Sequence, residues 1–254
     1  IDADFRPDQV PVTWRSGESV DAYRNGDGVI EGAEATVSFE DGAVTKTRRP
    51  KSYRHPALDE RLRRERTVQE VRLTHEARTL GVPTPVISDV DLAEARIVFE
   101  RVGETDLRNA ITESRVAEVG GHLARIHEAG FVHGDPTTRN VRVRAGSAGD
   151  AAGERSAEAR DPPDQRSTEA VQAVQPEGRD GRRPETVLID FGLGYYTDDV
   201  EDYAMDLHVL EQSLSGTADD PETLSAAAEE RYATVGDPTV IERLREIEGR
   251  GRYQ

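Results

Sequence analysis

The chain has 254 residues, enough for one large or two modest domains, and carries a formal net charge of −17 with a pI near 4.8. The lack of cysteine excludes disulfides, thiolate metal sites and a cysteine nucleophile. No apolar run approaches the length of about 18 residues that suggests a membrane span, and no signal-peptide pattern is visible, so we expect a cytoplasmic protein without a membrane partner.

Lysine is scarce. Only Lys46 and Lys51 are lysines among 33 basic residues, whereas Asp and Glu together number 50. The mean hydropathy is −0.69. This composition is typical of salt-loving microbes, in which carboxylates hold water and molar salt screens charge to about 3 Å. We therefore expect a halophilic source, and the global charge then says little about nucleic-acid partners.

The first part of the chain predicts a small β-rich region with one helix. Residues 1–28 show no regular pattern. Residues 29–39 and 43–46 alternate around a turn at Asp41-Gly42 and predict a hairpin. An amphipathic helix is expected over residues 58–80, ended by Gly81 and Pro83, and short strands at 86–87 and 97–99.

The second part is mainly helical. Helices are expected over residues 113–129, 200–214, 222–235 and 239–248, and short strands at 141–143 and 186–189. Residues 145–185 contain almost no large apolar side chain and cannot offset their ordering entropy by burial. We predict that this segment is a disordered insertion at a hairpin tip, which leaves the two flanking strands free to pair.

One constellation predicts phosphoryl transfer. His133-Gly134-Asp135 is followed by Asn140 and, after an apolar strand, by Asp190-Phe191-Gly192. A protein-kinase-like site needs one carboxylate toward the acceptor and two oxygen ligands for Mg²⁺. Asp135 is the candidate base or acceptor-positioning group, and Asn140 and Asp190 are the candidate metal ligands. His133 is expected to orient the loop rather than to transfer protons.

Lys46 lies late in the second strand, where a lysine can touch the α- and β-phosphates of ATP. Its plain alternative is a solvated strand charge, but an ammonium and a guanidinium are not interchangeable. Glu70 is the expected helix partner of Lys46, with Glu65 and Glu76 as competitors. The nucleotide-covering turn is expected at Ile30, Glu31, Gly32, Ala33, Glu34 and Ala35; with its single glycine it would otherwise be a plain hairpin turn.

The segment after Asp190-Phe191-Gly192 is short. Only Leu193–Asp199 separate it from the next expected helix, and no Ala-Pro-Glu sequence follows. Ordinary protein kinases place their peptide-binding platform in this region. Recognition of protein substrates in the usual way is therefore not expected.

Two blocks resemble a known family. Residues 46–59 with Arg66-Thr67 and Glu70, and Asp190–Gly194 with Val200–Glu211, closely resemble the small atypical kinase subunit of the KEOPS complex, which makes threonylcarbamoyladenosine in tRNA. The resemblance covers residues 29–254 outside the insertion. It implies an α+β fold of the two-lobe protein-kinase-like type, with lobes at 29–103 and 104–254. It also implies ATP and Mg²⁺ as cofactors, an ATPase activity that supports the transferase, and phosphorylation of Ser/Thr.

The same resemblance assigns phosphate binding to Lys46, pairing to Glu70, catalysis to Asp135 and Mg²⁺ to Asn140 and Asp190. The chain departs from the family pattern at Pro136, at Tyr203 where a lysine is expected, and in its shortened basic end, residues 250–254. The last two departures bear on contacts to the partner subunit and tRNA more than on ATP binding.

A second resemblance concerns the start of the chain. Residues 5–15 look like the C-terminal end of the threonylcarbamoyl-transferring subunit, which some archaea fuse to the kinase. We therefore expect residues 1–15 to be the tail of an upstream transferase domain and 16–28 a linker. The expected partners are that transferase, other KEOPS subunits and, through the complex, tRNA.

Two other functions remain open. Small-molecule phosphotransferases of the aminoglycoside or choline type also use His-Gly-Asp, but residues 46–56 argue against them. A nucleotide-sensing scaffold without catalysis would not need Asp135, Asn140 and Asp190. The basic run from Lys46 to Arg66 fits either phosphate or RNA binding, or a solvated helix face.

Overall fold

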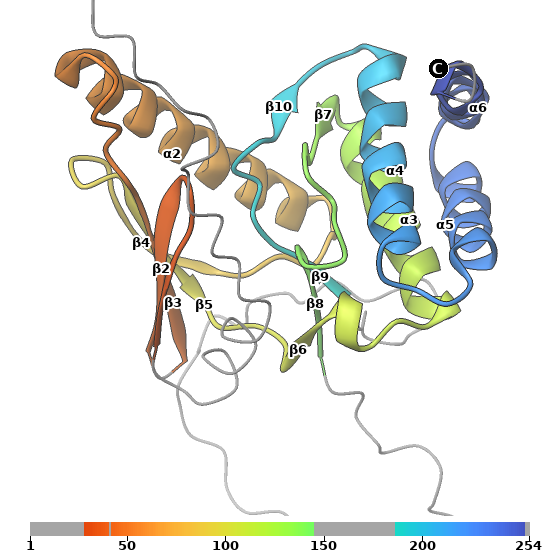
Figure 1. The fold of residues 1–254 in the computed structure, drawn as a ribbon, viewed down its shortest axis with the longest axis horizontal. Coiled ribbons are helices and arrows are strands. Elements are labelled where there is room, and N and C mark those ends of the chain that lie inside the picture. Colours follow the sequence, from red (N-terminus) through yellow and green to blue (C-terminus); the bar gives the residue numbers. More distant parts are fainter. Residues whose placement is uncertain (1–27, 41, 145–185, 252–254) are drawn as a thin grey trace, which may run out of the picture.

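The computed structural model describes residues 28–40, 42–144 and 186–251. The expected transferase tail at 1–15, nearly all of the expected linker and the insertion at 145–185 lie outside these residues. The described chain forms an antiparallel sheet with one long helix, followed by a mainly helical part (Figure 1). This arrangement agrees with the predicted α+β class.

The N-terminal sheet has five antiparallel strands in the order β1-β2-β3-β5-β4. The strands are β1 (Gly28–Glu31), β2 (Ala35–Glu40), β3 (Ala43–Arg48), β4 (Ile87–Asp91) and β5 (Arg96–Glu100). The run predicted at 29–39 is thus divided into two strands by a turn at residues 32–34. The fourth strand is longer than predicted and includes Asp89 and Asp91, because pairing with β5 compensates for their low strand propensity.

Helix α2 (Pro56–Thr79) is packed along the sheet. It begins two residues earlier than predicted, because proline is well tolerated in the first helical turn, where its missing N–H has no intrahelical partner. Its buried side chains include Leu73 and Ala77, but also the charged Glu70. A buried glutamate needs a compensating cation. The burial of Glu70 therefore suggests that a cation lies close to it, and the site described below contains that cation.

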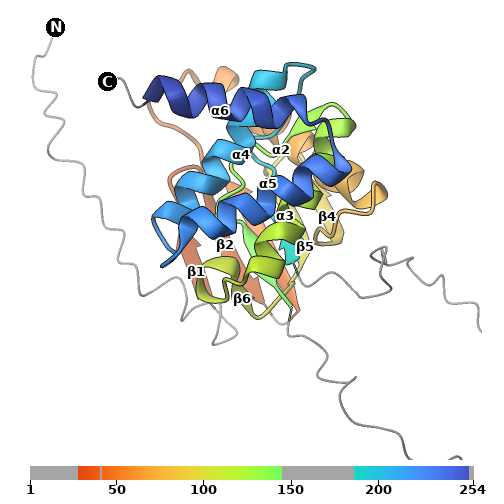
Figure 2. The same cartoon turned by 90° about the vertical axis from the view of Figure 1, so that its right-hand side faces the viewer.

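The described residues of the C-terminal part form four α-helices, which are labelled in Figure 2. They are α3 (Glu113–Glu128), α4 (Val200–Ser215), α5 (Pro221–Val235) and α6 (Thr239–Gly251). Short elements precede or separate them, among them β6 (Thr105–Asp106), the 3-10 helix η2 (Leu107–Asn109) and β7 (Phe131–Val132). Leucines of α3 and α4 and Tyr232 of α5 form a fully buried core between the helices.

Two glycines in the middle of α3 have a packing reason. A Cβ atom on Gly120 would lie 2.2 Å from the carbonyl oxygen of Ala228 in α5, and Gly121 faces the side chain of Arg231. Glycine weakens a helix by roughly 1 kcal/mol relative to alanine. Here it allows the backbones of α3 and α5 to approach closely.

The strands β8 (Val141–Val143) and β9 (Thr186–Leu188) pair as an antiparallel ladder, as predicted for the flanks of the insertion. Strand β10 (Tyr195–Tyr196) pairs with β7 and was not predicted. Such two-residue strands depend on a partner far along the chain. In the part of the chain that the structure describes, no helix has the length and apolar character needed to cross a membrane.

Candidate functional site

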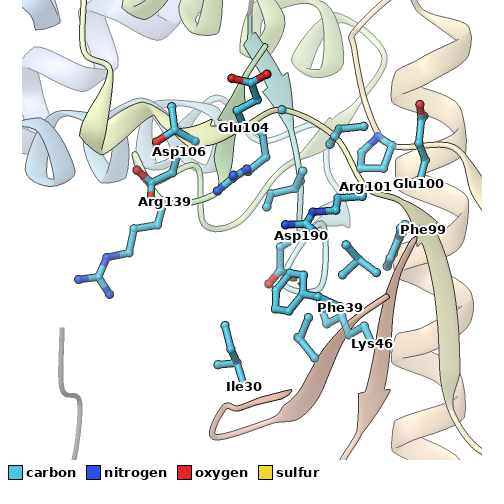
Figure 3. A pocket seen from close by; sticks show the side chains of 18 of the residues that line it. Ile30, Phe39, Lys46, Phe99, Glu100, Arg101, Glu104, Asp106, Arg139 and Asp190 are labelled. Atoms are coloured by element: carbon cyan, nitrogen blue, oxygen red, sulfur yellow. Dashed lines mark hydrogen bonds and ion pairs between the residues drawn. The ribbon is translucent and has the colours of Figure 1, made fainter. Parts of the chain in front are cut away.

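A cavity of about 870 Å³ lies between the sheet and the helical part. Ile30, Val37, Phe39, Val44, Phe99 and Ile189 supply its apolar wall. Lys46, Glu70 and Asp190 also line it, and the segment Glu100–Glu104, which joins the two parts, closes one side. Figure 3 shows Lys46 and Asp190 on the same side of the cavity as Phe39. An apolar slot with a few converging charges is typical of a site for a small polar ligand.

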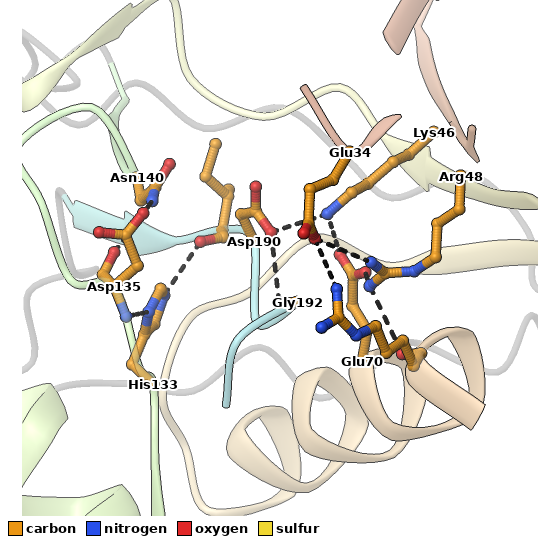
Figure 4. A network of polar contacts seen from close by, with 11 residues as sticks. Glu34, Lys46, Arg48, Glu70, His133, Asp135, Asn140, Asp190 and Gly192 are labelled. Atoms are coloured by element: carbon orange, nitrogen blue, oxygen red, sulfur yellow. Dashed lines mark hydrogen bonds and ion pairs between the residues drawn. The ribbon is translucent and has the colours of Figure 1, made fainter. Parts of the chain in front are cut away.

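Lys46 joins the two parts of the molecule. Its Nζ donates to Glu70 Oε1 and to Asp190 Oδ1, each at 2.7 Å (Figure 4). Burial opposes the ammonium form, but the two carboxylates outweigh it and hold the pKa of Lys46 above its usual value. For Asp190, burial raises the pKa and the nearby Lys46 ammonium lowers it. The net effect is a pKa below the usual value. The Lys46 ammonium and the Asp190 carboxylate therefore stay charged together.

Three glutamates of α2 were candidates for the partner of Lys46, and the structure shows where each of them lies. Glu70 contacts Lys46, whereas Glu65 pairs with Arg61 and Glu76 accepts a hydrogen bond from the Tyr196 hydroxyl. Glu70 is 1% exposed. The geometry thus brings Glu70, and neither of its two competitors, to the lysine.

Arg48 is a site residue that the sequence did not reveal. Its Nη2 donates to Glu70 Oε2 at 2.5 Å, so the two oxygens of one buried carboxylate serve two different cations. Arg48 lies two residues after Lys46 on β3, and side chains at that spacing point to the same face of a strand. This alternation was the available signal, but arginine is so frequent in the chain that it did not stand out.

The loop after β7 carries the predicted catalytic residues. Asn140 Nδ2 donates to the Asp135 carboxylate at 2.8 Å and to the Asp135 carbonyl at 2.9 Å. The Asp135 N–H donates to His133 Nδ1 at 3.3 Å, while His133 Nε2 donates to the Ile189 carbonyl at 3.0 Å. Both ring nitrogens are thus engaged, which suits an orienting role for this histidine. Burial raises the pKa of Asp135, partly offset by His133.

Asp206 of α4 fixes the backbone of this loop by hydrogen bonds. Its carboxylate accepts the backbone N–H of His133 at 2.6 Å and that of Gly134 at 2.8 Å. His127 Nε2 lies 3.1 Å from the same carboxylate, and its other ring nitrogen contacts the Tyr232 hydroxyl at 2.9 Å. The sequence showed Asp206 only as part of the α4 block. Asp206 directly precedes Leu207 of the apolar stripe, but its partners His133 and Gly134 lie 73 and 72 residues earlier, so nothing in the sequence indicated this role.

Gly134 brings the two catalytic segments together. Its φ is +83°, and a Cβ atom there would lie 2.3 Å from the Leu193 carbonyl oxygen. The segment after Asp190 therefore passes directly over the loop. Gln69 of α2 donates to the Gly194 carbonyl at 2.6 Å and ties the same segment to the N-terminal part.

The expected nucleotide-covering turn is placed at the β1–β2 connection. Ile30 lines the cavity, whereas residues 31–35 are not among its lining residues. Glu31 pairs with Arg49 at 3.3 Å, and Glu34 pairs with Arg66 of α2 at 2.8 Å. Ala35 is buried and begins β2.

The donor set fits a hard cation. Asn140 uses its Nδ2 toward Asp135, so its carbonyl oxygen is available, and Asp190 uses Oδ1 toward Lys46 and Gly192, so its Oδ2 is available. Amide and carboxylate oxygens are the ligands that Mg²⁺ prefers. The described residues contain no cluster of three or more His, Cys, Asp or Glu side chains that could hold a metal ion by themselves. A cation here would need further oxygens, such as those of a nucleotide.

Relatives cover the whole chain. Archaeal proteins named "probable bifunctional tRNA threonylcarbamoyladenosine biosynthesis protein" are 58% identical in Haloarcula marismortui, 52% in Halobacterium salinarum and 34% in Methanosarcina mazei. Each alignment spans 100% of this chain but only 41% to 42% of the relative. The chain therefore spans about two fifths of the length of these curated relatives. No family model matches the chain.

Solved structures agree with the fold. The Rio2 kinase of Chaetomium thermophilum, solved as a complex with ADP, Mg²⁺ and phosphoaspartate, has a TM-score of 0.55 at 15% identity, over 90% of this chain and 74% of that one. A second structure of that kinase has a TM-score of 0.52 at 15% identity, over 93% of this chain and 77% of that one. The resemblance seen in the sequence is thus confirmed: the chain is homologous, along its whole length, to part of the archaeal bifunctional tRNA threonylcarbamoyladenosine biosynthesis proteins, and its fold is protein-kinase-like.

Proposed function

We propose that the chain is an ATP-dependent phosphotransferase with ATPase activity, the kinase part of a larger protein that forms threonylcarbamoyladenosine in tRNA. The observation that carries this proposal is Lys46, whose ammonium bridges Glu70 and Asp190 at the wall of the cavity. An ammonium held between a helix glutamate and a metal-binding aspartate is the arrangement that positions ATP phosphates in kinases. The relatives' names supply the link to tRNA modification.

The lining of the cavity supplies both apolar surface and cations, as ATP would need. Ile30, Val37 and Phe99 offer an apolar wall to a purine ring. The lining residues also include cations that would attract a triphosphate: Lys46, Arg101, Arg108, Arg139 and Arg142. The Rio2 kinase with the same fold was solved with ADP and Mg²⁺, which supports the same cofactor class here.

Asn140 and Asp190 are the proposed Mg²⁺ ligands, and a bound Mg²⁺ would neutralise charge on the phosphates. Asp135 would accept a hydrogen bond from the attacking hydroxyl or water and orient it. Burial raises the pKa of this carboxyl, which makes it a better proton acceptor than an exposed aspartate. The Asn140 amide fixes one oxygen of Asp135 and leaves the other for the acceptor.

The acceptor side favours water or a residue of the complex over an ordinary protein substrate. The seven residues between Gly192 and α4 include β10, whose pairing with β7 keeps them against the core. We propose that Ser/Thr phosphorylation, including that of the protein itself, accompanies ATP hydrolysis. The transferase part, other KEOPS subunits and tRNA are the proposed partners, in the cytoplasm of a halophilic archaeon.

The first test is ATP hydrolysis in molar KCl with Mg²⁺, with and without the transferase part. We expect measurable hydrolysis that increases when the transferase is present. Asp190→Ala should abolish it, because the variant loses both the proposed metal ligand and the partner of Lys46. Asp219→Ala, an exposed aspartate on the loop after α4, is the matched control. Equal hydrolysis by Asp190→Ala and the parent would contradict the metal assignment.

A second test separates catalysis from a scaffold role. Complexes reconstituted with the parent chain or with Asp135→Asn are compared for threonylcarbamoylation of tRNA. The asparagine keeps the size of the side chain but cannot act as an acceptor of the same basicity. We expect a large loss of modification; equal rates would show that the kinase site serves the complex without chemistry at Asp135.

A further inference from the structure

Ser213 of α4 contacts the catalytic loop but has no part in the function proposed so far. Its Oγ accepts the backbone N–H of Thr138 at 2.9 Å and lies 3.0 Å from the Thr138 hydroxyl, so one side chain serves two polar groups. Thr138 is fully buried. A buried N–H that loses its partner is costly, so the loop depends on Ser213 at this point.

Ser213 is the second support that α4 gives to the loop. Asp206 accepts the N–H groups of His133 and Gly134, and Ser213 lies seven residues further along the same helix. Seven residues are close to two helical turns, so both side chains lie on one face of α4, about 10 Å apart along its axis. A single helix therefore holds the loop at its beginning and again at Thr138.

The support at Thr138 acts on Asn140 through a tight turn. The Asn140 N–H donates to the Thr137 carbonyl at 2.9 Å, which closes a turn that contains Thr138. The Thr138 carbonyl accepts the N–H of Arg108 at 3.2 Å, in the 3-10 helix η2. The side chain of Asn140 thus extends from a turn whose buried residue is held both by α4 and by η2.

The other side of Asn140 is fixed next to Asp190. The Asn140 carbonyl accepts the N–H of Ile189 at 2.9 Å, and Ile189 directly precedes Asp190. The separation of the two proposed Mg²⁺ ligands therefore depends on how the backbone of Asn140 is held, by Ile189 on one side and by the turn on the other. Mg²⁺ demands near-ideal octahedral geometry at about 2.0–2.1 Å, so a small displacement of one ligand weakens its binding.

We propose that Ser213 is a positioning residue for the metal side of the site: by fixing Thr138 it determines where the Asn140 oxygen lies. This inference rests on the proposed function. It also divides the work of α4 into two parts. Asp206 supports the residues that lead into Asp135, whereas Ser213 supports the turn that leads into Asn140.

The test is calorimetric titration of the full 254-residue chain with ADP in molar KCl, with and without Mg²⁺. In the parent, Mg²⁺ should strengthen the binding of ADP. In Ser213→Ala this gain should be about tenfold smaller, because one buried hydrogen-bond partner is lost, and the ADP affinity without Mg²⁺ should be unchanged. Ser215→Ala, at an exposed position of the same helix, is the control and should keep the full gain.

Two further variants separate the hydroxyl from the shape of the side chain. Ser213→Thr keeps the hydroxyl and should retain the gain from Mg²⁺. Ser213→Val has the shape of threonine without a hydroxyl and should behave like Ser213→Ala. An equal loss in the threonine and valine variants would mean that Ser213 only fills space, and would overturn the inference.

Amide hydrogen exchange measures the positioning itself. In Ser213→Ala the N–H of Thr138 should exchange faster than in the parent, while those of His133 and Gly134, which Asp206 holds, should stay protected. Unchanged exchange at Thr138, or an undiminished gain from Mg²⁺ in Ser213→Ala, would overturn the inference. A parent that binds no ADP would contradict the proposed function, and the role of Ser213 would fail with it.

Discussion

Arg48 and Glu70 form an ion pair in which Nη2 lies 2.5 Å from Oε2 and only 5% and 1% of the two side chains are exposed. Lys46 holds the other oxygen of the same carboxylate at 2.7 Å. Removing a cationic partner from a buried carboxylate is destabilising, because it leaves buried charge without compensation. The position of Glu70, and through it that of Lys46, therefore depends on Arg48.

Replacing Arg48 with methionine should destabilise the protein. The substitution keeps an unbranched apolar stem but leaves Glu70 Oε2 buried without its cation. Breaking a buried pair in this way costs about 3–5 kcal/mol. Urea unfolding in molar KCl measures the free energy of unfolding, with Arg61→Met on the exposed face of α2 as the control. A loss no larger than that of the control would mean that Lys46 alone suffices for Glu70.

Asp206→Asn tests the support beneath the catalytic loop. Aspartate accepts two backbone N–H groups, from His133 and Gly134, whereas asparagine must direct its amide NH₂ toward one of them. Hydrogen bonds to charged groups contribute about 1.5–3 kcal/mol each. We expect a lower kcat for ATP hydrolysis with adenosine affinity retained, because most of the apolar wall comes from strands β1, β2, β3 and β5. Asp219→Asn serves as the control, and an unchanged kcat would show that α4 does not position Asp135.

The sequence predicted those features whose signal is local. Helical periodicity placed α3 and α4 nearly to the residue, and the spacing of Asp135, Asn140 and Asp190 marked one site because their chemistry is specific. It could not predict Asp206 as a support, since its partner His133 lies 73 residues earlier in the chain. Strands β7 and β10, with two residues each, exist only because they pair with one another.

Arg48 illustrates a second limit. In the sequence of an arginine-rich chain, Arg48 looks like any solvent-exposed arginine of a strand. Only its burial against α2 distinguishes it from the exposed ones. The hydrogen bond from the Lys51 ammonium to the Ala33 carbonyl could not be predicted either, because it depends on how the β3–α2 connection lies against the β1–β2 hairpin. Charges that act through tertiary contacts need the fold before they can be told apart.

Gly134→Ala should disrupt the approach of the two catalytic segments. The residue has a φ of +83°, which disfavours any side chain, and its new Cβ would lie 2.3 Å from the Leu193 carbonyl oxygen. We expect loss of ATP hydrolysis with far-UV circular dichroism close to that of the parent. Gly249→Ala in α6, where a Cβ meets nothing within 4 Å, is the control. Full activity of Gly134→Ala would mean that the loop can shift without consequence.

The environment of Glu211 in α4 should make the free energy of unfolding depend on pH in an unusual way. Its side chain is 12% exposed. Burial and the neighbouring carboxylates of Glu248 and Glu229 raise its pKa to about 8, and Arg245 offsets this only in part. In the unfolded chain a glutamate titrates near pH 4.3. Between these two values the folded protein keeps a proton that the unfolded chain has lost, so the free energy of unfolding must decrease as the pH rises.

The decrease should be at most about 1.4 kcal/mol per pH unit and should end above the folded-state pKa. Glu211→Gln removes the titrating group while keeping its size, so the variant should be more stable than the parent at pH 8 and similar to it at pH 4. Urea unfolding at several pH values measures the difference between the two proteins, in which the remaining groups cancel. Glu230→Gln, on the exposed face of α5, should follow the parent at every pH. If Glu211→Gln also did so, the carboxyl would have to be ionised in the folded state.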